Sequence, residues 1–111
     1  MEIMTDRRSV AANATESNVV AGKAHEFCTR PSVVRVYGTA SAVGLNVSVT
    51  VGNRIFVQDQ ELNAQNRLPI YPDDFIVDAA GMPGDRILVA LRNTTGGALN
   101  GFTKVEITPV R

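Results

Sequence analysis

Residues 45–57 read Leu-Asn-Val-Ser-Val-Thr-Val-Gly-Asn-Arg-Ile-Phe-Val, and this stretch says more about the architecture than any other part of the chain. Apolar residues occupy every second position before the Gly-Asn pair, and the alternation resumes at Ile55 and Val57. A period of two is typical of a strand with one face buried and the other in water. Glycine followed by asparagine suits a two-residue type II′ turn. The stretch therefore predicts a β-hairpin with a valine-rich core face.

Similar strand patterns occur on both sides of this hairpin. The candidate strands are residues 24–28, 32–40, 74–79, 85–93 and 102–110. In residues 32–40, Val34 and Val36 alternate with polar or aromatic neighbours, and in residues 74–79 the alternation places Phe75 inward. Between two of the strands, residues 81–85 form a turn in which Gly84 can adopt a positive φ.

About seven to eight short strands, each with one apolar face, predict two sheets packed face to face. The fold class expected is therefore all-β, a single antiparallel β-sandwich. We favour a jelly-roll-like arrangement, and an up-and-down barrel is the alternative.

Residues 1–22 differ from the rest of the chain. They are rich in Ala, Asn, Ser and Thr, and their apolar residues follow no sustained period. The sequence therefore predicts an extended N-terminal arm over residues 1–22, followed by a β-sandwich domain over residues 23–111. The arm is either a frayed terminus or a segment that becomes ordered against a neighbouring subunit.

One connection, residues 60–73, is longer than the others and carries no hairpin signal. It contains Leu62, Leu68, Ile70 and Tyr71, which makes it too apolar for a disordered loop. Its two prolines favour an extended chain. The segment either crosses between the sheets and covers the end of the core or presents a surface to a partner, and the two interpretations are compatible.

The charge balance argues against several classes of partner. Eleven basic and eleven acidic side chains give a formal net charge of zero. Nucleic-acid binding then lacks the basic surface that supplies most of its affinity, and a polybasic membrane footing is absent too. No apolar run reaches the roughly 18 residues of a membrane span. The N-terminal residues lack the apolar core of a signal peptide, so we expect synthesis in a cytoplasm.

The residues available for chemistry are few. His25 and Cys28 are the only histidine and the only cysteine, so no intrachain disulfide forms and a zinc site lacks ligands. No nucleophile elbow or phosphate-binding loop occurs. We therefore expect a protein that is not an enzyme and that has no catalytic residue, metal or cofactor. Instead, Tyr37, Phe56 and Leu88 stand on the nominally wet faces of their strands, where a patch of them would mark a contact surface.

Two segments complete the comparison with a known class of protein. Residues 66–75 read Asn-Arg-Leu-Pro-Ile-Tyr-Pro-Asp-Asp-Phe, and residues 83–97 read Pro-Gly-Asp-Arg-Ile-Leu-Val-Ala-Leu-Arg-Asn-Thr-Thr-Gly-Gly. Together with the arm, the sandwich and the neutral charge, they resemble the small accessory proteins of tailed-phage virions, the cement or decoration subunits of capsids. The resemblance is one of architecture and carries over no functional residue.

This resemblance implies a structural virion protein that stabilises a shell through contacts between subunits. It would be made in the host cytoplasm and reside on the capsid surface. Its partners would be the major capsid protein, other virion subunits or further copies of itself, without nucleic acid or membrane. The contact residues expected from the arm, the long connection and the wet strand faces are Val10, Val19, Val20, Tyr37, Phe56, Leu62, Leu68, Ile70, Tyr71 and Leu88.

Two other functions stay open at this point. The first is a ligand-binding module, such as a head that recognises a glycan or a receptor. The absence of tryptophan weakens a sugar platform without removing it. The second is a small hydrolase that uses His25.

Overall fold

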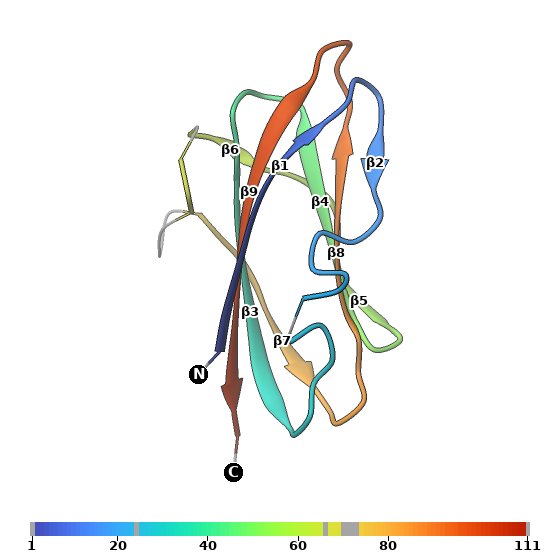
Figure 1. Ribbon diagram of the computed structural model, residues 1–111, viewed down its shortest axis with the longest axis vertical. Coiled ribbons are helices and arrows are strands. Elements are labelled where there is room, and N and C mark those ends of the chain that lie inside the picture. The colour runs from blue at the N-terminus through green and yellow to red at the C-terminus, as the bar shows by residue number, and fades with distance from the viewer. Residues whose placement is uncertain (1, 24, 66, 70–73, 111) are drawn as a thin grey trace.

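The protein is two β-sheets packed face to face, as the computed structural model in Figure 1 shows. The structure describes residues 2–23, 25–65, 67–69 and 74–110. Its strands are β1 (Glu2–Val10), β2 (Thr15–Glu16), β3 (Ser32–Ala40), β4 (Leu45–Val51), β5 (Arg54–Glu61), β6 (Asn63–Ala64), β7 (Phe75–Gly81), β8 (Ile87–Asn93) and β9 (Leu99–Pro109). The predicted all-β sandwich is confirmed.

The strand order is that of a jelly roll. One sheet runs β1-β9-β3, with β7 and the short β6 both pairing with β3, and the other runs β2-β8-β4-β5. Strands that follow one another along the chain therefore lie in opposite sheets at β1–β2, β2–β3, β3–β4, β5–β6, β7–β8 and β8–β9. This double winding distinguishes a jelly roll from an up-and-down barrel, in which consecutive strands are neighbours.

The predicted hairpin forms at β4 and β5. Val51 pairs with Arg54, and Gly52 adopts a φ of 65°, which is the value that the first central residue of a type II′ turn requires. The turn before β8 is also as predicted, with Gly84 at a φ of 89° and the Asp85 N–H bonded to the Met82 carbonyl at 3.0 Å. Strand β3 has the bounds expected from its alternation.

The core lies between the sheets and consists of alternate residues of the central strands. Among the apolar residues with 2% exposure or less are Leu45, Val47, Val49 and Val51 of β4, Ile87, Val89 and Leu91 of β8, and Val34, Val36 and Val105 of the facing sheet. Burying each such side chain contributes roughly 1.5–3 kcal/mol relative to exposure. A shift of one residue in β4 would turn all of its apolar side chains outward, so this face also fixes the register.

The N-terminal segment belongs to the sandwich, which corrects the prediction of a separate arm. Strand β1 pairs with β9 from Glu2↔Ile107 to Val10↔Leu99. Val10, Val19 and Val20 are at most 1% exposed and belong to the core. The domain therefore has no boundary after residue 22.

Charged side chains on the inner face of β1 explain why its sequence shows no alternation of apolar and polar residues. Asp6 and Arg8 lie on the same face as the buried Met4 and Val10. They pair with each other at 2.7 Å, and Lys23 approaches Asp6 at 3.5 Å. The Arg8 guanidinium also donates to the Val19 carbonyl. The ion pairs allow this polar sequence to occupy a sheet edge.

Residues 17–23 and 25–28 run along the edge of β8 mostly without strand pairing, and we call them the strap. The predicted strand at residues 24–28 is reduced to one isolated bridge, Phe27↔Arg86, within the described residues. Asn18 fastens the strap, because its side chain imitates a peptide group. Its Nδ2 donates to the Ile87 carbonyl, while its Oδ1 accepts from the N–H of Val89 and of Val20.

Two β-bulges reverse side-chain directions that simple alternation predicts. In β5, Ile55 pairs with Thr50 while Val57 pairs with Val49, so one extra residue, Phe56, turns toward the core. In β7, Val77 pairs with Val36 while Phe75 pairs with Tyr37. The expectation that Phe56 faces outward and Phe75 inward is therefore wrong.

The long connection crosses from one sheet to the other, as one of the two interpretations proposed. Strand β5 ends at Glu61, and β6 then lies parallel to β3 on the opposite sheet. Leu62, only 2% exposed, is buried at the crossing. Arg67 forms an ion pair with the buried Asp74 at 3.1 Å, and the Thr39 hydroxyl of β3 donates to the Arg67 carbonyl.

Candidate functional site

The outer face of the β2-β8-β4-β5 sheet carries a row of apolar side chains. Ile55 of β5 lies opposite Thr50 of β4, which in turn lies opposite Leu88 of β8. Phe27 of the strap pairs with Arg86, so it is a diagonal neighbour of Leu88. Ile55 is 64% exposed and Phe27 53% exposed. We call Ile55, Leu88 and Phe27 the apolar row.

Ion pairs lie on the strands that carry the apolar row. Arg92 of β8 forms an ion pair with Asp59 of β5 at 2.7 Å. Arg92 lies on the outer face of β8, four residues beyond Leu88. Near Phe27, the Arg86 guanidinium donates to the Glu26 carboxylate. An apolar centre surrounded by a polar or charged rim is the usual composition of a protein–protein interface.

The contact residues predicted from sequence are found in three environments. Val10, Val19, Val20 and Leu62 are buried in the core of the chain itself, and Phe56 packs against that core. Leu68 is 49% exposed, and Leu88 is half-buried in the apolar row. Ile70 and Tyr71 lie outside the described residues. Since the buried side chains are inaccessible in the folded chain, they are corrected from interface to core.

Tyr37 lies on the outer face of the other sheet but is only 3% exposed. Its hydroxyl donates to Glu106 at 2.8 Å, and its ring meets the edge of the Phe75 ring at a centroid distance of 5.5 Å. The Lys104 ammonium lies over the same ring. Tyr37 is thus covered by neighbours in its own chain and offers little surface to a partner.

Sequence reasoning missed Ile55 and Phe27. The alternation of residues predicted both Ile55 and Val57 in the core. It could not reveal the bulge, which turns Ile55 outward and Phe56 inward. Phe27 lay in a segment expected to be a strand, with no sign of the face it occupies. The isolated bridge with Arg86 determines its direction.

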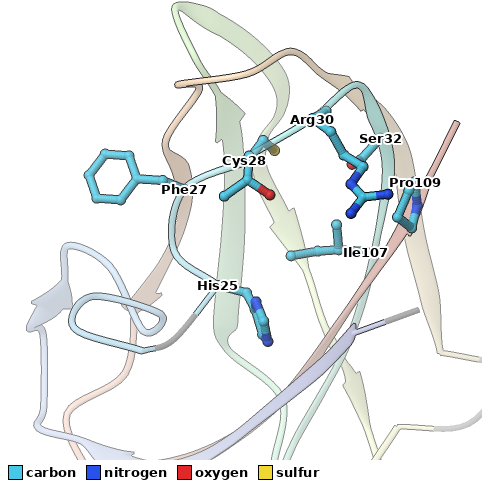
Figure 2. A pocket seen from close by; sticks show the side chains of 8 residues that line it. His25, Phe27, Cys28, Arg30, Ser32, Ile107 and Pro109 are labelled. Atoms are coloured by element: carbon cyan, nitrogen blue, oxygen red, sulfur yellow. The ribbon is translucent and has the colours of Figure 1, made fainter. Parts of the chain in front are cut away.

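A cavity of about 260 Å³ opens between the strap and the ends of β3 and β9. Figure 2 shows its lining residues, with the Phe27 ring directed away from the cavity. The residues that line it are His25, Phe27, Cys28, Thr29, Arg30, Ser32, Ile107 and Pro109. The only histidine and the only cysteine of the sequence are therefore neighbours here, although they were not expected to act together.

The Cys28 sulfur packs toward the core. A Cβ placed on Gly81 would lie 2.5 Å from it, so the sulfur fills the space that glycine leaves. Burial raises the pKa of this thiol, and the nearby Asp85 carboxylate raises it further. The protonated thiol is a weak nucleophile. Together with its burial, this gives Cys28 a packing role.

The described part of the chain contains no group of three or more His, Cys, Asp or Glu side chains arranged to hold a metal ion. Residues 59, 74 and 78, which supply carboxylates near strand ends, are instead engaged by Arg92, Arg67 and Arg35. These acidic side chains form ion pairs with arginines.

Glu26 makes stability dependent on pH. The N–H of Gly22 donates to its carboxylate at 2.8 Å, and this bond, followed by that from Arg86, lowers the pKa of Glu26. A lowered pKa in the folded state gives stability that is present above the unfolded pKa and is lost as pH falls through the folded value. We expect urea-unfolding free energies to fall below about pH 5, and the Glu26→Gln variant to show a shallower fall. If the free energy of unfolding fell equally with decreasing pH in wild type and in Glu26→Gln, this role of Glu26 would be contradicted.

Among the residues described, no helix is long and apolar enough to cross a membrane. No protein-family model matches the chain, and no curated protein or solved structure matches it either. A functional assignment therefore has to come from the apolar row, the cavity and the fold.

Proposed function

We propose that this protein is a structural virion subunit of the capsid cement or decoration kind, which stabilises a shell through contacts between subunits. The observation that carries the proposal is the apolar row on the outer face of the β2-β8-β4-β5 sheet. Two of its three members are more than half exposed. Apolar side chains gathered on one sheet face are a feature of contact surfaces, whereas scattered ones need no explanation.

The strand order supports the same proposal by analogy. Jelly rolls occur in viral capsid proteins, in lectins and in cupins. A cupin-like site built from several histidines is excluded, because the sequence has one histidine. A fold alone does not establish a function, so the weight rests on the apolar row.

The energetics favour Ile55 as the centre of the contact. It lies on β5, at the edge of its sheet, and its exposed side chain has no covering neighbour comparable to those of Tyr37. Complete burial of such a side chain contributes roughly 1.5–3 kcal/mol. A few residues of this kind dominate most interfaces, and many copies on a shell multiply a modest contact.

We expect Ile55→Asp to weaken binding to the shell by about tenfold or more, because it places a charge in an apolar contact. The assay is co-sedimentation of the purified protein with particles from which this subunit has been stripped. Val43→Asp is the matched control, since Val43 is 65% exposed but lies in the connection between β3 and β4. Thermal melting of both variants checks that the fold is intact.

One result would overturn the proposed function, and another would overturn the contact surface assigned to it. One is absence of the chain from gradient-purified virus particles of its natural source, examined by quantitative mass spectrometry. The other is equal shell binding by wild type, Ile55→Asp and Val43→Asp. The second result would reject the apolar row while leaving the first measurement to judge the virion assignment.

A further inference from the structure

Arg30 differs from the other arginines that the structure describes. Five of them are in ion pairs, namely Arg8, Arg35, Arg67, Arg86 and Arg92. Arg7 and Arg54 stack on the rings of Phe102 and Phe56. Within the described part of the chain, Arg30 has neither kind of partner, and it lines the cavity. We infer that the cavity binds a small organic anion whose carboxylate or phosphate group pairs with Arg30.

The charge on the lining of the cavity is positive. Arg30 lines it, and no aspartate or glutamate is among the lining residues. Two carboxylates of residues that contact the strap or belong to it have other partners. Glu26 accepts from Gly22 and Arg86, and Asp85 accepts from the Met82 N–H. An anion in the cavity would therefore supply the charge that the described lining residues lack.

The backbone that carries Arg30 is fixed in place. The Ser32 hydroxyl donates to the Arg30 carbonyl at 2.9 Å, and the Val110 N–H donates to the Pro31 carbonyl at 2.8 Å. Only the side chain of Arg30 is then left to be ordered on binding, which keeps the entropic cost low. Figure 2 shows this side chain descending beside Ile107 and Pro109, on the same side of the cavity mouth.

The shape and chemistry of the cavity define the ligand class. A guanidinium recognises carboxylate and phosphate through paired N–H donors, and an imidazole N–H adds a third donor. Ile107 and Pro109 provide an apolar wall for a short hydrocarbon part. At about 260 Å³ the cavity lies below the usual range for drug-sized ligands, so it suits a molecule of a few heavy atoms.

The test is an NMR titration of the ¹⁵N-labelled full chain at pH 7 with butyrate, acetate and inorganic phosphate in separate series. We expect saturable shifts confined to residues 25–32 and 107–109, with a Kd of about 1–10 mM for the best probe. Tighter binding of butyrate than of acetate would indicate that the ligand is a carboxylate with an apolar tail. Tighter binding of phosphate than of butyrate would assign a phosphate group.

Arg30→Gln is expected to weaken binding by about tenfold or more, because the charge-assisted bonds are lost. Arg35→Gln is the matched control, since Arg35 is exposed and its partner is Asp78 on the outer face of the sheet. The absence of saturable shifts up to 50 mM of every probe, on the order of ten times the expected Kd, would overturn the inference. Equal affinities for wild type and Arg30→Gln would overturn it too.

This inference does not depend on the shell contact. Ile55→Asp should bind the anion as wild type does, because Ile55 is not among the cavity-lining residues. Loss of anion binding in Arg30→Gln with normal shell binding, and the reverse in Ile55→Asp, would establish that the two kinds of binding are separable, although Phe27 belongs to both surfaces.

Discussion

Replacing Asn18 with leucine is expected to lower the free energy of unfolding by about 4 kcal/mol, because three buried backbone groups lose their partner at once. Its amide donates to the Ile87 carbonyl and accepts from the N–H groups of Val89 and Val20. Leucine has a similar size but cannot form these bonds, and each unsatisfied buried group costs about 1–3 kcal/mol. Urea denaturation followed by circular dichroism measures the change.

The matched control for this variant is Asn100→Leu. Asn100 is exposed on β9, and its hydrogen bonds to Ser41 are made by its backbone N–H and carbonyl, which a substitution of the side chain leaves in place. Its replacement should change stability by about 0.5 kcal/mol or less. A loss below about 1 kcal/mol for Asn18→Leu would mean that backbone bonds alone, such as Val19 N–H to the Val89 carbonyl, hold the strap.

Gly81→Ala is expected to destabilise the fold by about 2 kcal/mol through overpacking. The added Cβ would lie 2.5 Å from the Cys28 sulfur and 3.5 Å from methyl groups of Val34 and Val51. Cys28 cannot withdraw easily, because its N–H donates to the Asp85 carbonyl and its own carbonyl accepts from the Gly84 N–H. The measurement is again urea unfolding.

A double-mutant cycle with Cys28→Ala isolates the clash. Removing the sulfur should reduce the cost of Gly81→Ala to less than half, a coupling of about 1 kcal/mol or more. Cys28→Ala alone also leaves a small void, and the cycle subtracts this cost. If Gly81→Ala costs the same in both backgrounds, the strain arises elsewhere on β7.

The sequence was sufficient where alternation was unbroken. Strand β3 and the Gly52-Asn53 turn were predicted with their positions, since Val34 and Val36 alternate with outward-facing residues in β3 and glycine followed by asparagine specifies the turn. Strand β1 was missed, because Asp6 and Arg8 interrupt its apolar face, and their ion pairs with each other and with Lys23 make those positions tolerable. Hydropathy records each residue separately and cannot represent such a pair.

The candidate site was predictable only in part for a related reason. Leu88 was identified because β8 alternates without a bulge. Ile55 was assigned to the core, since the extra residue that reverses its direction leaves no trace in the sequence. Arg30 gave no signal at all, because its distinction lies in the partner it lacks among the described residues.

The ion pairs along β1 also have a consequence for aggregation. A strand at a sheet edge presents free backbone groups to which a strand of another molecule can add, and repeated addition produces fibrils. Asp6 and Arg8, directed inward at this edge, would have to be desolvated beneath an incoming strand. Open-ended growth of fibrils through β1 is thus disfavoured.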